Sequence, residues 1–245
     1  RSGGSPDALV LCSSAAAPLR LVTLASTAEH SGVWAAAAAG WTYARVVDQA
    51  VRDAGLQDGV SLRWADAQHA NGWADVAARI GLMSPDAVLL AGGYDGGDVT
   101  ALVKTARDLL AIRQRSGAPL TLLFAGNTRA EPLLRRLYDG RADLRVAANV
   151  LPSPDRPNIQ PAGEALDELY CQRKIGSLPG FGLVASQCAA PVLSSARALA
   201  LAWSALASLR GEAVIGFDLG AVSTVAGLAL PQDGYHLAVT SELGA

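Results

Sequence analysis

Long apolar runs are missing from this sequence, although 51% of its 245 residues are hydrophobic. No stretch reaches the roughly 18 uninterrupted apolar residues of a membrane-spanning helix. The chain begins Arg1-Ser2-Gly3-Gly4-Ser5, without the charged and apolar segments of a signal peptide, and its one methionine is Met83. We therefore expect a processed or excised piece of a longer protein, with no membrane partner and a core of considerable size.

A strong excess of charge of either sign is also missing. The formal net charge is −2 at pH 7, and the charged residues make up only 17% of the chain. Binding to nucleic acid or to an anionic membrane surface needs clustered positive charge that neutralises phosphates. The composition therefore favours neither nucleic acid nor a membrane surface as a partner.

Cysteine and histidine are scarce, with three residues of each. The odd number of cysteines and the absence of metal-ligand spacing predict reduced, buried thiols in a reducing compartment, which suits the cytoplasm. The three histidines are isolated in the sequence, so no Ser-His-Asp or Cys-His grouping can be inferred. Catalytic residues stay unassigned, and whether the chain is an enzyme is left open.

The stretch Pro85–Asp98 carries the clearest local signal. An apolar run over 87–91 predicts a buried strand, two glycine pairs predict a turn with unusual backbone angles, and Asp98 is the expected N-cap of a helix. Ligands of α/β proteins bind at the carboxyl ends of such strands. A tight turn without a ligand explains the same pattern. The candidate ligand crevice consists of Gly92, Gly93, Asp95, Gly96, Gly97 and Asn127.

The order of apolar segments predicts an α/β fold. Strands expected over 87–91, 120–124 and 145–150 alternate with helical patterns, which favours a mostly parallel sheet with helices on both faces. A further strand is expected over 60–64. The segment 43–54 is ambiguous: helical spacing favours a helix, while 44–47 alone could form a strand.

The second half of the chain has a different pattern. Four prolines over 152–161 exclude regular structure, and a helix is expected over 162–173. A long helix over 190–209, apolar around much of its circumference, is expected to be packed on two sides. Three apolar runs separated by turns predict an antiparallel meander. We therefore divide the chain into an α/β domain (1–151), a connection (152–188) and a C-terminal helix with its meander (189–245).

The first turn of this meander has the composition of a phosphate-binding loop. A carboxylate, a flexible turn residue and two hydroxyls lie within seven positions: Asp218, Gly220, Ser223 and Thr224. Backbone N–H groups and hydroxyls can bind a phosphate, and the Asp218 carboxylate can hold a metal through water. An ordinary hairpin connection gives the same spacing.

Several segments resemble known families. The segment Ile215–Ala226 resembles the second phosphate motif of the ATPases related to actin and the heat-shock chaperones. Other segments, in matching order, are similar to the MutL protein family associated with glutamate mutase, which is unrelated to the mismatch-repair protein of that name. These segments are Ser13–Ala16 with Leu19-Arg20, Leu89–Asp98, Ala125–Asn127, Asn149–Pro152 and Asn158–Pro161.

The resemblance implies an actin-like nucleotide-binding accessory protein, of chaperone or reactivation type, that serves an adenosylcobalamin-dependent mutase and uses ATP and Mg²⁺ at full length. It also implies a strand over 44–47. The sequence departs from the family where Ala17-Pro18 and Ala221 replace glycines and where Val225 replaces an acid. The first phosphate motif is missing from this segment, which is therefore expected to hold no cofactor tightly. The alternative is a non-catalytic ligand-binding or protein-interaction domain that has lost nucleotide binding.

Overall fold

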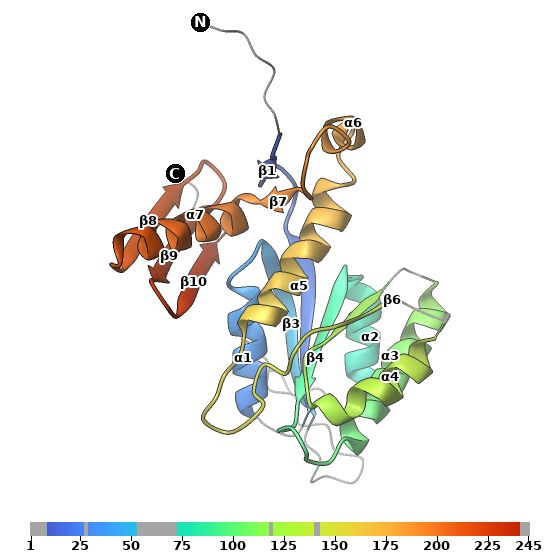
Figure 1. Ribbon diagram of the computed structural model, residues 1–245. Coiled ribbons are helices and arrows are strands. Elements are labelled where there is room, and N and C mark those ends of the chain that lie inside the picture. Colours follow the sequence, from blue (N-terminus) through green and yellow to red (C-terminus); the bar gives the residue numbers. More distant parts are fainter. Residues whose placement is uncertain (1–8, 27–28, 53–72, 118–119, 140–142, 241–245) are drawn as a thin grey trace, which may run out of the picture. The chain divides into compact units, whose positions relative to one another are not determined.

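The computed structural model describes residues 9–26, 29–52, 73–117, 120–139 and 143–240. The chain forms two compact units (Figure 1), which are described separately. The parallel-sheet unit comprises Leu19–Ala39 and Ala44–Leu166. The meander unit comprises Arg1–Pro18, Gly40–Tyr43 and Asp167–Ala245.

Five parallel strands build the sheet of the first unit, in the spatial order β3-β2-β4-β5-β6. They are β2 (Leu19–Ser26), β3 (Ala44–Arg52), β4 (Ala87–Gly92), β5 (Thr121–Phe124) and β6 (Asp143–Val146). The helices between them are α1 (Glu29–Ala39), α2 (Trp73–Met83), α3 (Thr100–Ser116), η1 (Thr128–Ala130) and α4 (Glu131–Tyr138). The predicted mostly parallel sheet is confirmed.

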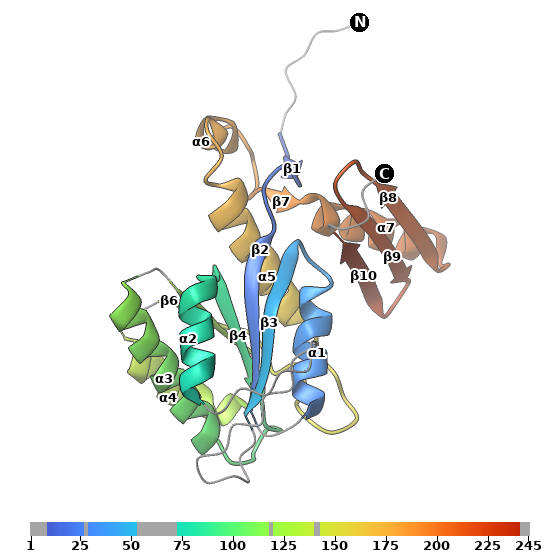
Figure 2. The same cartoon turned by 180° about the vertical axis from the view of Figure 1, so that it is seen from behind.

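Helices cover both faces of this sheet, as the apolar runs predict (Figures 1 and 2). All six residues of β4 are buried. Val88 and Leu90 join a core cluster with residues of α2, α3 and α4. Because side chains alternate along a strand, Ala87, Leu89 and Ala91 face the opposite side, where α1 packs. Burial on both faces explains why β4 is a continuous apolar run.

The helix favoured for 43–54 is wrong, and the strand left open is correct: 44–52 form β3. The pairing of β2 with β3 passes from Leu21↔Val46 to Val22↔Asp48, which leaves Val47 as the extra residue of a β-bulge. A bulge breaks the two-residue alternation of a strand. The adjacent apolar residues Val46 and Val47 then produce a spacing that resembles a helix.

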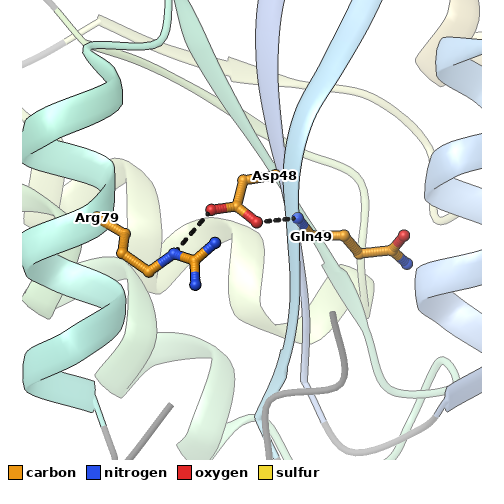
Figure 3. A network of polar contacts seen from close by, with 3 residues as sticks. All are labelled: Asp48, Gln49 and Arg79. Atoms are coloured by element: carbon orange, nitrogen blue, oxygen red, sulfur yellow. Dashed lines mark hydrogen bonds and ion pairs between the residues drawn. The ribbon is translucent and has the colours of Figure 1, made fainter. Parts of the chain in front are cut away.

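Asp48 is a buried carboxylate on β3, with 6% of its surface exposed. Figure 3 shows it between α2 and its own strand: Arg79 Nε lies 3.3 Å from one carboxylate oxygen, and the Gln49 N–H donates to the other at 3.0 Å. Burial raises the pKa of Asp48, and Arg79 opposes this rise only in part. Removal from water therefore outweighs the ion pair.

The meander unit contains a short parallel pair, β1 (Cys12–Ser13) with β7 (Leu193–Ser194), and an antiparallel sheet in the order β10-β9-β8. This sheet consists of β8 (Val214–Leu219), β9 (Thr224–Leu230) and β10 (Gly234–Thr240). The helical segments are α5 (Gln160–Tyr170), which begins in the other unit, η2 (Cys171–Ile175), α6 (Phe181–Ala185) and α7 (Ser195–Arg210). The predicted meander is confirmed, while its actin-like type stays a prediction.

Helix α7 lies against the three strands of the meander (Figure 1). The ring of Trp203 occupies the space that side chains at Gly216 and Gly227 would fill, and these two glycines are partners in the β8–β9 ladder. The expectation that α7 is packed on two sides is wrong. Its buried residues lie on one side, whereas Leu206 and Leu209 are exposed.

Other expectations need adjustment at single residues. Helix α3 begins at Thr100 with Val99 as its N-cap; Asp98 accepts hydrogen bonds from the backbone N–H and the hydroxyl of Thr100. The three cysteines are free, but the expected burial is wrong: Cys12 is exposed, and Cys171 and Cys188 are half-buried. The strand expected over 60–64 lies outside the described residues.

The described helices were also compared with the length and hydropathy of a membrane span, and none of them has both.

The raised pKa of Asp48 predicts a pH dependence of stability. A carboxyl whose folded pKa exceeds its unfolded pKa contributes stability at low pH that is lost as the pH rises through the folded pKa. The free energy of unfolding of the wild type, minus that of Asp48→Asn, should therefore fall as the pH rises above the unfolded pKa of about 4. Urea unfolding at several pH values measures this difference.

Asp98→Asn is the control of opposite sign. Hydrogen bonds from Thr100 lower the pKa of Asp98, so its contribution to stability is lost as the pH falls. The corresponding difference for Asp98→Asn should rise with pH. If the Asp48 difference also rose with pH, the Arg79 pair would outweigh burial, and the interpretation of Asp48 would be wrong.

Candidate functional site

The glycine-rich loop that follows β4 lies at the topological switch point of the parallel sheet. Strand β2 is followed in the chain by β3 on one side and, after α2, by β4 on the other. Ligands of open α/β sheets bind outside the carboxyl ends of the strands where the strand order reverses in this way. Ser26 pairs with Gly92 at these ends. The position predicted for Gly92 and Gly93 is thus the switch point itself.

The glycines at this position meet a steric need. Gly92 has φ +137°, and a Cβ there would collide with the backbone carbonyl of Ser26. Gly93 and Gly96 also have positive φ, at +70° and +85°, whereas Gly97 does not. These backbone conformations disfavour side chains, so the glycines bring two strand ends into close contact.

Asp95 and two buried asparagines organise the loop. The Thr128 N–H donates to Asp95 Oδ1 at 2.9 Å, and Asn149 Nδ2 donates to the same oxygen at 3.0 Å. Asn149 Nδ2 also donates to the Gly93 carbonyl at 2.9 Å. Asp95 therefore ties the loop after β4 to the segments that follow β5 and β6.

Asn127 completes this network from the end of β5. Its side chain is fully buried; Nδ2 donates to the Gly97 carbonyl at 3.1 Å, and Oδ1 accepts from the Arg129 N–H at 3.1 Å. The Arg129 guanidinium donates to the Gly96 carbonyl at 2.8 Å. The structure thus brings all six predicted crevice residues together, but the Asn127 amide already binds the protein on both its nitrogen and its oxygen.

The turn between β8 and β9 holds the second group of predicted residues. The Gly220 N–H donates to the Ser223 carbonyl at 2.9 Å and closes the turn. Asp218 is exposed, and Gly220, Ser223 and Thr224 are half-buried. This arrangement leaves a carboxylate accessible to solvent at the end of a strand.

The strand alternation divides these residues between two faces of the meander. Asp218 pairs with Val225, and paired residues of an antiparallel ladder share a face. Val225 is 1% exposed and so lies in the core. Leu219 pairs with Thr224, which places Thr224 on the opposite face from Asp218. Asp218 and Thr224 therefore do not act from the same side of the sheet.

The residues nearest to the Asp218 turn include one that the sequence reasoning missed. Burial raises the pKa of the Tyr43 hydroxyl, the nearby hydroxyls of Ser223 and Ser14 lower it, and the charge of Asp218 raises it further. The ring of Tyr43 packs against that of Tyr170, with 5.2 Å between centroids. The small-residue loop around Ser14 and the predicted phosphate turn thus meet at one tyrosine.

Comparison with known proteins identifies the family. The model of the MutL protein family matches residues 2–233. The chain belongs to the MutL protein family. A curated relative, Protein MutL of Clostridium tetanomorphum, is 29% identical over 89 residues, a stretch that covers 36% of this chain and 18% of the relative. No solved structure matches the chain.

Membership in the MutL family confirms the resemblance that the ordered segments indicate. Membership shows the family of the chain. The stretch that matches the curated relative spans less than a fifth of that relative's length. The activity and the partners of this MutL-family protein are therefore matters for proposal.

A cavity of about 610 Å³ lies in the meander unit of the MutL-family chain, beside the π-helical turn η2. Its lining is mainly apolar and includes Phe181 and Val192, with Asp167 and Cys171 in the wall. Burial raises the pKa of the Asp167 carboxyl, against hydrogen bonds from Ser194, and raises the pKa of the Cys171 thiol to about 12. Such a cavity suits an apolar group, and it contains none of the residues predicted from sequence.

The hydrogen bonds of the buried Asn127 amide are expected to stabilise the glycine-rich loop. In Asn127→Ala, the Gly97 carbonyl and the Arg129 N–H lose their partner, so the free energy of unfolding should fall by about 1–3 kcal/mol. Urea unfolding measures the change. Thr128→Ala is the matched control, because Thr128 is exposed and its bond to Asp95 comes from the backbone. Equal stabilities of the two variants would show that the amide does not organise the loop.

Proposed function

We propose that this chain is the central part of an actin-like nucleotide-binding accessory protein, of chaperone or reactivation type, for an adenosylcobalamin-dependent mutase in the cytoplasm. The observation that carries the proposal is the exposed Asp218 carboxylate beside a closed turn with hydroxyls. This turn lies where the family resemblance puts a phosphate motif. Membership in the MutL family supports the choice of mutase system.

The residues of the turn fit ATP with Mg²⁺. Mg²⁺ in phosphate sites keeps several waters and is bound through one or two carboxylates together with substrate phosphates. One exposed carboxylate, Asp218, meets this need. No group of three His, Cys, Asp or Glu side chains among the described residues could hold a metal without such a ligand. Mg²⁺ is therefore proposed to arrive with the nucleotide.

Binding of Mg²⁺-ATP should raise the thermal stability of the full-length protein. A ligand at about 100 times its Kd stabilises by about 2.7 kcal/mol, which is a shift of several degrees in a thermal melt. Asp218→Ala should abolish the shift. Asp233→Ala, an exposed acid in the turn between β9 and β10, should retain it. The proposal fails if the wild type shows no shift with any nucleotide at millimolar concentration.

A second candidate is a domain that binds a ligand or a protein without nucleotide. Val225, where the resemblance expects an acid, is buried in the core and has no part in solvent chemistry. The glycine-rich loop is held by its own hydrogen bonds. Both observations favour a recognition surface over a catalytic one.

The two candidates differ in how they depend on Asp218. If the chain serves the mutase without nucleotide, affinity capture should recover mutase subunits equally with the wild type and with Asp218→Ala, with or without Mg²⁺-ATP. If the nucleotide controls the interaction, the recovery with the wild type should change on addition of Mg²⁺-ATP, and the recovery with Asp218→Ala should not.

A further inference from the structure

Tyr43 carries a buried hydroxyl that lacks a well-aligned hydrogen bond within the described residues. The residue is 5% exposed. Among the described residues, no group lies in position for a good hydrogen bond to its hydroxyl. Buried tyrosine hydroxyls usually have a partner, because an unpaired one loses its bonds to water without replacement. Such a group needs an explanation, and a partner that is bound during function supplies one.

The surroundings of this hydroxyl indicate what that partner is. Ser14 and Ser223 approach it closely enough to lower its pKa, although burial dominates and raises the pKa overall. The phenol is therefore protonated at neutral pH and can donate. Ser14 is exposed and Ser223 is half-buried, so both hydroxyls can be reached from solvent. Three hydroxyl donors from distant parts of the chain converge beside the Asp218 turn.

The aromatic neighbours of Tyr43 hold this cluster in place. The Tyr43 ring packs on Tyr170, which is fully buried, and the Tyr170 hydroxyl donates to the Ala16 carbonyl at 3.2 Å. Tyr170 thus fixes both the Tyr43 ring and the loop that carries Ser14. The Ala15 N–H also donates to the Ser13 hydroxyl at 3.2 Å. The donors are arranged before any ligand arrives, which reduces the entropy cost of binding.

We propose that Ser14, Tyr43 and Ser223 form an oxyanion subsite that receives a phosphate group of the nucleotide beside Asp218. This inference rests on the proposed function. Hydroxyl donors suit phosphate oxygens. The Tyr43 ring packs on Tyr170 and is therefore less available to stack on the base of a nucleotide. The Asp218 carboxylate would repel a bare phosphate, so the subsite takes the phosphate together with Mg²⁺.

Tyr43→Phe tests the subsite, because it removes only the hydroxyl. Since this hydroxyl makes no well-aligned hydrogen bond to the described residues, the stability of the variant should stay close to that of the wild type. Its Kd for Mg²⁺-ATP should rise about tenfold or more, as expected when a hydrogen bond to a charged group is lost. Calorimetric titration of the full-length protein measures the Kd, and urea unfolding measures stability.

Tyr138→Phe is the matched control. The Tyr138 hydroxyl donates to the Ala106 carbonyl at 2.8 Å in the parallel-sheet unit. Its removal should reduce stability and leave the Kd for Mg²⁺-ATP unchanged. Ser14→Ala, at an exposed position, should weaken Mg²⁺-ATP in the same direction as Tyr43→Phe and provides the test should the tyrosine variant fail to fold.

The outcomes separate the subsite from the proposed function. If the wild type binds Mg²⁺-ATP and both Tyr43→Phe and Ser14→Ala bind it equally well, the subsite is wrong and the proposed function stands. If the wild type binds no nucleotide, the proposed function fails, and Mg²⁺-pyrophosphate becomes the probe. Binding of this probe to the wild type that is weakened in Tyr43→Phe would keep the subsite as a phosphate site, and no binding would overturn it.

Discussion

Burial of both faces of β2 and β4 is the constraint on which the parallel-sheet unit depends. A strand covered by helices on both sides can satisfy its backbone only by pairing with its neighbours, so polar groups accumulate where the strands end. At those ends Gly92 lies directly against Ser26. Asp95, Asn127 and Asn149 then supply the hydrogen bonds that the turning backbone lacks. The glycine-rich loop is thus first a solution to a problem of the fold.

The local sequence predicts what depends on local properties. The apolar run of β4, its glycine turn, the helix α3 and the three strands of the meander follow from periodicity and turn residues, and the structure confirms them. Strand β3 could not be obtained in this way. The bulge at Val47 is defined by the pairing of β3 with β2 before and after this residue. This pairing joins segments that are distant in the sequence, so local periodicity cannot reveal it.

The candidate site divides along the same line. Asp218, Gly220 and Ser223 are neighbours in sequence, and their composition marks the turn. Tyr43 reaches that turn from a position far earlier in the chain, and no pattern in the sequence connects the two. The alternation of β9 could have shown that Thr224 faces away from Asp218. Sequence reasoning therefore finds the turn and misses the tyrosine that lies beside it.

The glycine-rich loop after β4 and the turn after β8 differ in how far their buried polar groups are already hydrogen-bonded within the protein. In the glycine-rich loop the buried Asn127 amide already binds the protein through both its nitrogen and its oxygen. In the meander unit the buried hydroxyl of Tyr43 has no hydrogen bond among the described residues, and the neighbouring carboxylate of Asp218 is exposed. A buried polar group without a partner destabilises the free protein, and this cost is removed when a ligand binds to the group. Because the turn after β8 combines such a group with accessible charge, we propose nucleotide chemistry there, and we propose architecture or the recognition of a partner for the glycine-rich loop.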